Sequence, residues 1–162
     1  MRFTVRVFLT LTLACSAATT IGADAFRVRL ELDNGHLAQV FFGCREEATA
    51  DYDPKIDIMA PPHGIATGYT VFVAPNGKHH FYRDMRSCAS SVTWEFLAEV
   101  YKNNPITVAW DPDKLPENRT FRLQAAGGAP LDMRRKSKLV IEKTSRIKIT
   151  AALKRAAGHE NP

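Results

Sequence analysis

The stretch FRVRLELDNGHLAQVFF, residues 26–42, decides the fold class. Apolar and polar residues alternate on both sides of Asn34-Gly35. Alternation of this kind is typical of half-buried strands, and Asn-Gly favours the two-residue turn of a β-hairpin. The stretch GYTVFVAPNGKHHFYRDM, residues 68–85, repeats the pattern around Asn76-Gly77. The sequence therefore predicts two hairpins, each with its turn at an Asn-Gly pair.

Further short strands are expected along the rest of the chain, and helical periodicity is hard to find in it. Turn signals such as Asn103-Asn104-Pro105 and Gly127-Gly128 separate these segments. About eight short strands without intervening helices predict an all-β, antiparallel two-sheet sandwich. The later expected strands are residues 92–101, 106–111, 119–124, 138–143 and 146–153.

Aromatic residues are expected to supply much of the core, because their side chains bury the largest apolar areas. An alternative is a carbohydrate platform, on which exposed rings stack against sugars, and Tyr69, Tyr82 and Tyr101 are the candidates for it. Most aromatic residues alternate with polar neighbours, which favours the core. The expected core aromatics are Phe41, Phe72, Trp94, Phe96, Trp110 and Phe121.

Residues 1–25 have the features of a secretory signal peptide. Arg2 and Arg6 precede a short apolar run, and small residues lead to Ala25. We expect cleavage after Ala25, a β-sandwich domain over residues 26–153 and a flexible tail over residues 154–162. An alternative makes Cys15 a lipid-attachment cysteine. The protein is thus expected to be secreted, periplasmic or at the cell surface.

Cys44 and Cys88 remain after that cleavage. An even pair of cysteines in an exported chain predicts a disulfide bond. Closing a loop of this length would stabilise the fold by about 4 kcal/mol in the chain-entropy model. A redox or metal-binding pair is the alternative, but the two cysteines lack CxxC spacing.

Basic residues dominate the C-terminal part of a chain whose formal net charge is +5. Such a surface attracts anionic partners. Export disfavours nucleic acid, so acidic glycans, lipid headgroups or an acidic partner protein are the candidate ligands, and a merely solvated strand face is the alternative. The candidate basic patch consists of Arg134, Arg135, Lys136 and Lys138.

Three acids, Asp51, Asp53 and Asp57, lie close together around Pro54. Carboxylates are ligands that calcium prefers, although the spacing does not match an EF-hand loop. Asp side chains also hold turns by accepting hydrogen bonds from nearby backbone amides. The favoured interpretation is a structural loop between strands, with a calcium site as the alternative and no other cofactor expected.

Catalytic patterns are weak. Ser87, Ser90 and Ser91 lack a Gly-x-Ser-x-Gly elbow. His79 and His80 are adjacent, so in a strand they face opposite ways and make a poor metal pair. Asp84 and Arg86 should share one strand face, where they could form an ion-pair network with Asp111. These patterns predict that the protein is not an enzyme.

The order of short motifs resembles that of Ig-like or fibronectin-III-like sandwich domains of bacterial extracellular proteins. The resemblance spans nearly all of residues 26–162, although each motif alone is weak. It rests on Phe42-Gly43, Ala48-Thr49, Asp53, Asp57, Pro61-Pro62, Asp84 with Arg86, Trp94, Trp110-Asp111, Leu115-Pro116 and Asp132-Met133.

The resemblance implies a non-catalytic module of secreted or surface proteins. We therefore expect an extracytoplasmic domain that acts through protein–protein contacts, as a structural or assembly subunit at the cell surface. A carbohydrate-binding module and a calcium-dependent adhesion domain are the alternative functions.

Overall fold

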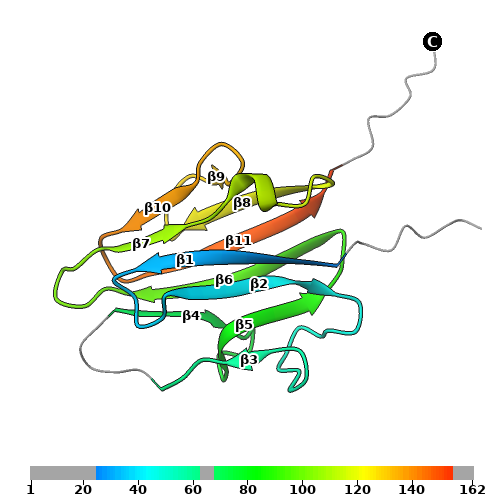
Figure 1. The fold of residues 1–162 in the computed structure, drawn as a ribbon, viewed down its shortest axis with the longest axis horizontal. Helices are drawn as coiled ribbons and strands as arrows, with labels where there is room; N and C mark the ends of the chain where they lie inside the picture. Colours follow the sequence, from blue (N-terminus) through cyan, green and yellow to red (C-terminus); the bar gives the residue numbers. More distant parts are fainter. Residues whose placement is uncertain (1–24, 63–67, 155–162) are drawn as a thin grey trace, which may run out of the picture.

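The computed structural model describes residues 25–62 and 68–154 and shows an all-β protein (Figure 1). In this part of the chain the only helical segment is a 3₁₀ turn, η1 (Pro112–Lys114). The strands are β1 (Phe26–Asp33), β2 (Gln39–Arg45), β3 (Ile58–Met59), β4 (Tyr69–Val73), β5 (His80–Ser87), β6 (Ser91–Glu99), β7 (Ile106–Ala109), β8 (Arg119–Ala125), β9 (Leu131–Asp132), β10 (Lys138–Ile141) and β11 (Ser145–Leu153).

All of these strands belong to one continuous sheet. Its order is β10-β7-β1-β2-β5-β4-β6-β11-β8-β9, and β3 pairs with β5 beside this path. The expectation of an all-β fold is confirmed, whereas a wholly antiparallel arrangement is wrong because β2 and β5 run parallel. Instead of two separate sheets, the chain forms a single mixed sheet that curls into a half-barrel.

Strand β5 joins the two parts of this curled sheet. Its first residues, His80 and Phe81, pair with β4, and the segment from Arg83 to Ser87 pairs with β2. The hairpin partner β4 continues the sheet on the other side by pairing with β6. Because β5 changes partner along its length, the sheet turns at this strand.

The curl brings strands that are distant in the sheet order face to face. The ring of Phe42 on β2 lies 5.0 Å from that of Trp94 on β6, and Phe26 on β1 lies 5.5 Å from Phe121 on β8. These aromatic contacts form the centre of the core. Aliphatic residues of β1, β7, β8 and β11 surround it, among them Leu30, Ile106, Leu123, Ile147 and Ile149.

The expected core aromatics are buried with one exception. Phe72, Trp94, Phe96, Trp110 and Phe121 lie in the core. Phe41 was expected there, but alternation along β2 directs Val40, Phe42 and Cys44 inward and leaves Phe41 half-buried on the opposite face. There it packs edge-on against Tyr82.

Both predicted hairpins are present, but only the second turns at its Asn-Gly pair. In the β4–β5 hairpin Gly77 has φ +70°, a conformation that favours glycine. In the β1–β2 hairpin the connection extends over residues 34–38. Gly35 forms a bridge with Gly68, so the expected two-residue turn is wrong. The later strands all start and end within two residues of their predicted bounds.

The predicted disulfide joins Cys44 and Cys88, whose Cα atoms are 5.0 Å apart. Cys44 lies near the end of β2, and Cys88 directly follows β5. The bond therefore clamps the parallel strand pair at the end where β1 begins and β11 finishes (Figure 1).

The predicted signal peptide, including Cys15, lies outside the described residues except for Ala25. Of the predicted tail only Lys154 is described, and its backbone N–H donates to the Asn118 carbonyl oxygen over 2.9 Å. These predictions about the two ends of the chain stay predictions.

Gly43→Ala should destabilise the protein. The new methyl carbon would lie 2.0 Å from the Phe26 carbonyl oxygen and 2.9 Å from Met85 Cε, so β1 and β2 would have to separate. Overpacking of this kind costs about 1–3 kcal/mol or more. Urea unfolding of the variant and the wild-type protein measures this loss of stability. The control is Gly128→Ala, whose nearest neighbour lies 3.5 Å away. Equal stability of the two variants would contradict the close approach of β1 and β2.

Loss of the disulfide should lower the free energy of unfolding by about 4 kcal/mol. The chain-entropy model gives this value for a bond between residues 44 positions apart in the sequence. The Cys44→Ala/Cys88→Ala variant and the reduced wild-type protein should show similar losses in urea unfolding. Reduction serves as the control because it leaves the side-chain packing in place. An unfolding midpoint that reduction does not shift would contradict the clamp.

Candidate functional site

The outer face of β1, β2 and β5 carries a group of arginines. Alternation along β1 buries Val28, Leu30 and Leu32, so its remaining side chains point outward. Strand pairing then forms two rows across this face. One row is Arg29, Phe41 and Arg83, and the neighbouring row is Arg27, Gly43 and Met85. Because Gly43 has no side chain, Met85 and the backbone of β1 approach it closely, and a Cβ there would lie 2.9 Å from Met85 Cε.

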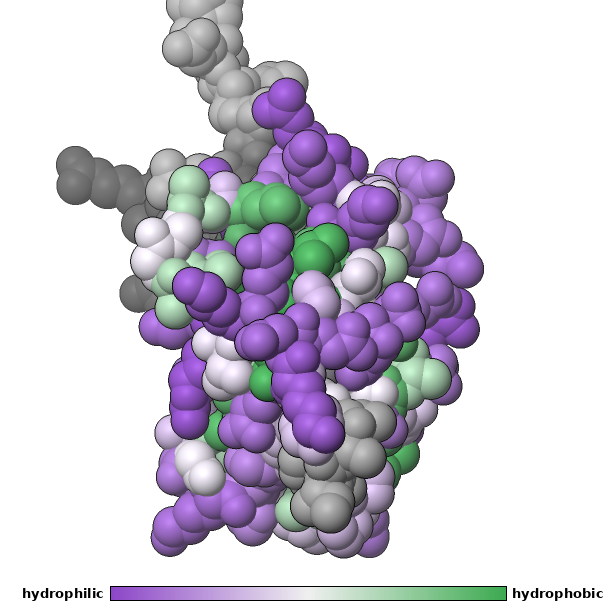
Figure 2. Space-filling view, turned by 90° about the vertical axis from the view of Figure 1, so that its left-hand side faces the viewer, coloured by the Kyte–Doolittle hydropathy of each residue, from purple (hydrophilic) through white to green (hydrophobic). Residues whose placement is uncertain are grey.

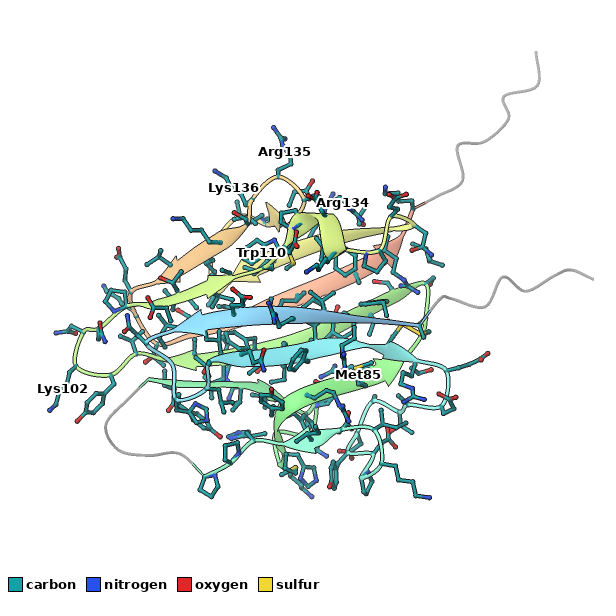
Figure 3. The ribbon with its side chains drawn as sticks, viewed as in Figure 1. Met85, Lys102, Trp110, Arg134, Arg135 and Lys136 are labelled. Atoms are coloured by element: carbon teal, nitrogen blue, oxygen red, sulfur yellow. A yellow bond between two sulfur atoms is a disulfide. The ribbon has the colours of Figure 1, made fainter. Side chains whose placement is uncertain are left out.

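A hollow of about 380 Å³ lies beside this row and is lined by Arg27 and Met85. We call it the arginine hollow. Figure 3 shows Met85 at the β2–β5 pair, near the end at which β1 begins. The side of the hollow away from β1 is formed by the loop before β3, which contributes Ile56. The residues that line it are Ala25, Phe26, Arg27, Cys44, Arg45, Ile56, Arg83 and Met85.

Two of the three arginines are positioned without an ion pair. Arg83 donates from Nε to the Ile56 carbonyl oxygen over 2.8 Å. The Arg27 guanidinium lies 5.3 Å from the centre of the Phe41 ring. Within the described chain neither has a carboxylate oxygen within 4.0 Å, whereas Arg45 pairs with Glu47 at 3.5 Å. The hollow therefore holds two positive charges that no adjacent carboxylate neutralises directly.

A second hollow, the long groove, adjoins the first at Arg27 and crosses β2, β1 and β7. Its volume is about 770 Å³. Ala109 lies beside Glu31 in the pairing of β1 with β7, and its small side chain leaves space above the sheet. The groove carries both charge signs, because its lining includes Arg29, Glu31, Asp111 and Lys114.

Two buried carboxylates lie on β5 and beside it. Asp84 pairs with Phe42 in register, so it faces the core, where Arg86 binds it at 2.9 Å. Burial raises the pKa of Asp84, and the Arg86 contact partly opposes this. Burial likewise raises the pKa of Asp57, against the hydrogen bonds that its carboxylate accepts from the backbone N–H groups of Asp53 and Met85.

The shared face predicted for Asp84 and Arg86 is confirmed, but Asp111 is not part of their network. Arg86 also donates to the carbonyl oxygens of Thr93 and Val73, which ties β5 to β6 and β4. Asp111 instead caps η1 by accepting from the Asp113 N–H and pairs with Lys114. The Asp84–Arg86 pair is thus an internal link between the two parts of the sheet.

In the acidic loop, which contains Asp51, Asp53 and Asp57, the carboxylates hold the local backbone in place by hydrogen bonds. The Asp53 carboxylate accepts from the Thr49 N–H and hydroxyl. Asp51 accepts from the Asn76 side-chain amide, which fastens the loop to the β4–β5 turn. Among residues 25–62 and 68–154, no three His, Cys, Asp or Glu side chains form a group that could hold a metal ion. These contacts favour the structural interpretation of Asp51, Asp53 and Asp57 over calcium binding.

The predicted basic patch divides into two parts. Arg135 and Lys136 extend away from the body of the protein, whereas Arg134 lies back against it (Figure 3). Arg134 donates to the carbonyl oxygens of Leu115, Pro116 and Arg119. Arg134 is therefore structural, and Arg135, Lys136 and Lys138 form the exposed part of the patch.

The three tyrosines do not form an exposed row. Tyr69 is buried, and its hydroxyl bonds His80 Nδ1 at 2.8 Å. Tyr82 is half-buried against Phe41, and Tyr101 lies on another part of the surface beside Lys102. Because Tyr69 is buried, it cannot belong to the exposed carbohydrate platform considered above. The adjacent histidines contact different partners, as expected, since His79 packs against Tyr52.

The arginine hollow was not predicted from the sequence. Alternation in β1 already placed Arg27 and Arg29 on an outer face, which was a usable signal. The approach of Arg83 could not be predicted, because it depends on the parallel pairing of β2 with β5. No local pattern specifies such a pairing, since its two strands are distant in the sequence.

Comparisons with known proteins give no match for this chain: no family model, no curated protein and no solved structure is similar to it. Within residues 25–62 and 68–154 there is no helix with the length and apolar character needed to span a membrane.

Stability should depend on pH through Asp84. Its folded-state pKa lies above the ordinary value of 3.8, so the folded protein binds the proton more tightly than the unfolded chain. The stability that proton binding by Asp84 contributes is fully present below pH 3.8 and is lost as the pH rises through the raised pKa.

We therefore expect the stability difference between the wild-type protein and Asp84→Asn to grow as pH falls from 7 towards 4. At neutral pH the variant should already be less stable by about 3–5 kcal/mol, because Arg86 loses its buried partner. Thermal unfolding across this pH range measures both effects. A difference that shrinks on acidification would mean that the pKa is lowered instead.

Proposed function

We propose that this protein is a non-catalytic, extracytoplasmic module that acts through protein–protein contacts, as a structural or assembly subunit at the cell surface. The observation that carries the proposal is the outer face of β7, β1, β2 and β5. There the arginine hollow and the long groove adjoin, and two arginines without an ion pair lie beside an aromatic ring. Arginine and aromatic side chains are enriched where proteins bind one another.

The disulfide supports an oxidising compartment as the place of action. Bonds of this kind persist in secreted and periplasmic proteins and are rare in the reducing cytosol. Cys44 is completely buried, so the bond is part of the core of this fold. Export by the predicted signal peptide belongs to the same proposal.

Kinship with Ig-like or fibronectin-III-like sandwich domains is also part of the proposal. The order of motifs supports it, as do the ring contacts between facing parts of the sheet. The parallel β2–β5 pair departs from the antiparallel pattern of such domains. The proposed kinship therefore concerns a variant in which β5 joins the two parts of one curled sheet.

Other surfaces differ in their lining. The hollow of about 380 Å³ at the basic patch is lined by Pro112 and residues 134–138, with no aromatic ring among them. The end of the sheet on the left in Figure 1 faces the viewer in Figure 2, where hydrophilic side chains cover most of it and hydrophobic ones form small areas. The exposed apolar residues Ile58 and Met59 lie on the two-residue strand β3. A hollow of about 370 Å³ at the Asp33 end of β1 is lined by the acids Glu31 and Asp33 and contains no arginine.

Site-specific photo-crosslinking in cells that make the protein tests this function. A photoreactive phenylalanine analogue at Arg29, on the outer face, should crosslink to one defined protein of the envelope or the secreted fraction. The same analogue at Gln124, an exposed position on β8, serves as the control and should not. Absence of any crosslink from Arg29, or identical products from both positions, would contradict the proposal.

A further inference from the structure

We infer that the arginine hollow binds a carboxylate attached to an apolar group, and that its natural source is the C-terminal residue of a partner polypeptide. This inference rests on the proposed function in so far as it treats the outer face as the binding surface. It adds the class of ligand and the residues that recognise it.

The arginines supply the recognition of the carboxylate. Arg83 uses Nε for the Ile56 carbonyl oxygen, and none of its terminal nitrogens makes a hydrogen bond within the described chain. The Arg27 guanidinium rests on Phe41 and likewise has no hydrogen-bonded partner there. A guanidinium presents paired N–H donors that match the two oxygens of a carboxylate. Both groups thus retain free donors at the same hollow.

The positions of these donors are set before any ligand arrives. Arg83 is half-buried and held at Nε by backbone, which limits the rotation of its side chain. Arg27 is held by its contact with the Phe41 ring, and Phe41 is itself packed against Tyr82. Binding to positioned groups loses less conformational entropy, so the arginines favour affinity as well as specificity.

The rest of the hollow suits an apolar group. Ile56 and Met85 line it together with the start of β1. Its volume of about 380 Å³ lies near the lower end of the usual range for ligand sites, roughly 300–1,000 Å³. A carboxylate with one apolar side chain, as at a polypeptide C-terminus, can use both parts of this lining. A bare inorganic anion would leave the apolar part unused.

The buried carboxylate nearest to this arrangement does not compete for the arginines. Both oxygens of Asp57 accept backbone N–H groups, from Asp53 and Met85. Asp57 thereby holds the loop that carries Ile56 against β5. Its charge also lowers the positive potential at Arg83 without occupying the donors.

Titration of the isotope-labelled, disulfide-bonded protein with N-acetyl-leucine, followed by NMR, tests the inference. Backbone signals of Arg27, Gly43 and Met85 should shift. N-acetyl-leucinamide, which lacks the charge, should bind at least about tenfold more weakly, because charge-assisted hydrogen bonds are lost. Equal binding of acid and amide, or shifts confined to β8 and β11, would overturn the inference.

Variants assign the effect to the arginines. Arg27→Gln and Arg83→Gln should each weaken N-acetyl-leucine binding about tenfold or more. Arg122→Gln, on the outer face of β8, is the matched control and should bind normally. Because Arg27 is exposed, its variant keeps the test valid even if Arg83→Gln disturbs the Ile56 loop. Unchanged affinity in Arg27→Gln would overturn the inference.

Two further probes identify the source of the carboxylate. A hexapeptide ending in leucine should bind more tightly than N-acetyl-leucine if a polypeptide C-terminus is the ligand, and amidation of that terminus should abolish the gain. Hexanoate binding as tightly as the hexapeptide would overturn the polypeptide source and assign the site to small apolar acids. If the Arg29 analogue still crosslinks to a partner but none of the carboxylic acids binds, only the inferred ligand class is wrong. If the acids do not bind and the crosslink is also absent, the proposed function is wrong as well.

Discussion

The parallel pairing of β2 with β5 is the constraint on which the rest of the structure depends. It lets β5 pair with β4 at its beginning and with β2 over its remaining length. The Cys44–Cys88 bond clamps this pair at one end, and the Asp84–Arg86 pair ties β5 to β4 and β6 from within. Without the pairing, the ladder of hydrogen bonds between the two parts of the sheet would be interrupted at β5, and the facing aromatic residues of the core would lose this connection.

The same pairing creates the surface to which we assign function. It places Arg83 and Met85 beside Phe41 and Gly43, which the β1–β2 hairpin already sets beside Arg29 and Arg27. The missing side chain at Gly43 lets β1 and Met85 approach β2 closely, and Ile56 lines the hollow beside them. One backbone arrangement therefore accounts for the closed core on one face of β2 and for the arginine-rich surface on the other, which we propose binds a partner.

Local patterns in the sequence were sufficient for much of the fold. Period-two alternation located the strands, cysteine number predicted the disulfide, and aromatic spacing identified most of the core. Two features depend on pairings between distant segments and could not be predicted: the parallel strands and the bridge between Gly35 and Gly68. The outward position of Phe41 follows instead from alternation along β2, which directs Val40 and Phe42 to the core. Charge counting directed attention to residues 134–138, where Arg134 is structural, and missed Arg27 and Arg83, whose charges meet only through the β2–β5 pairing.

The most direct test of this account is the pattern of NMR cross-strand contacts in the oxidised protein. The account predicts nuclear Overhauser effects between backbone protons of residues 41–45 and 83–87 that follow a parallel register, with Phe42 beside Asp84 and Gly43 beside Met85. An antiparallel pattern between these strands, or no contact between them while the disulfide is intact, would contradict it.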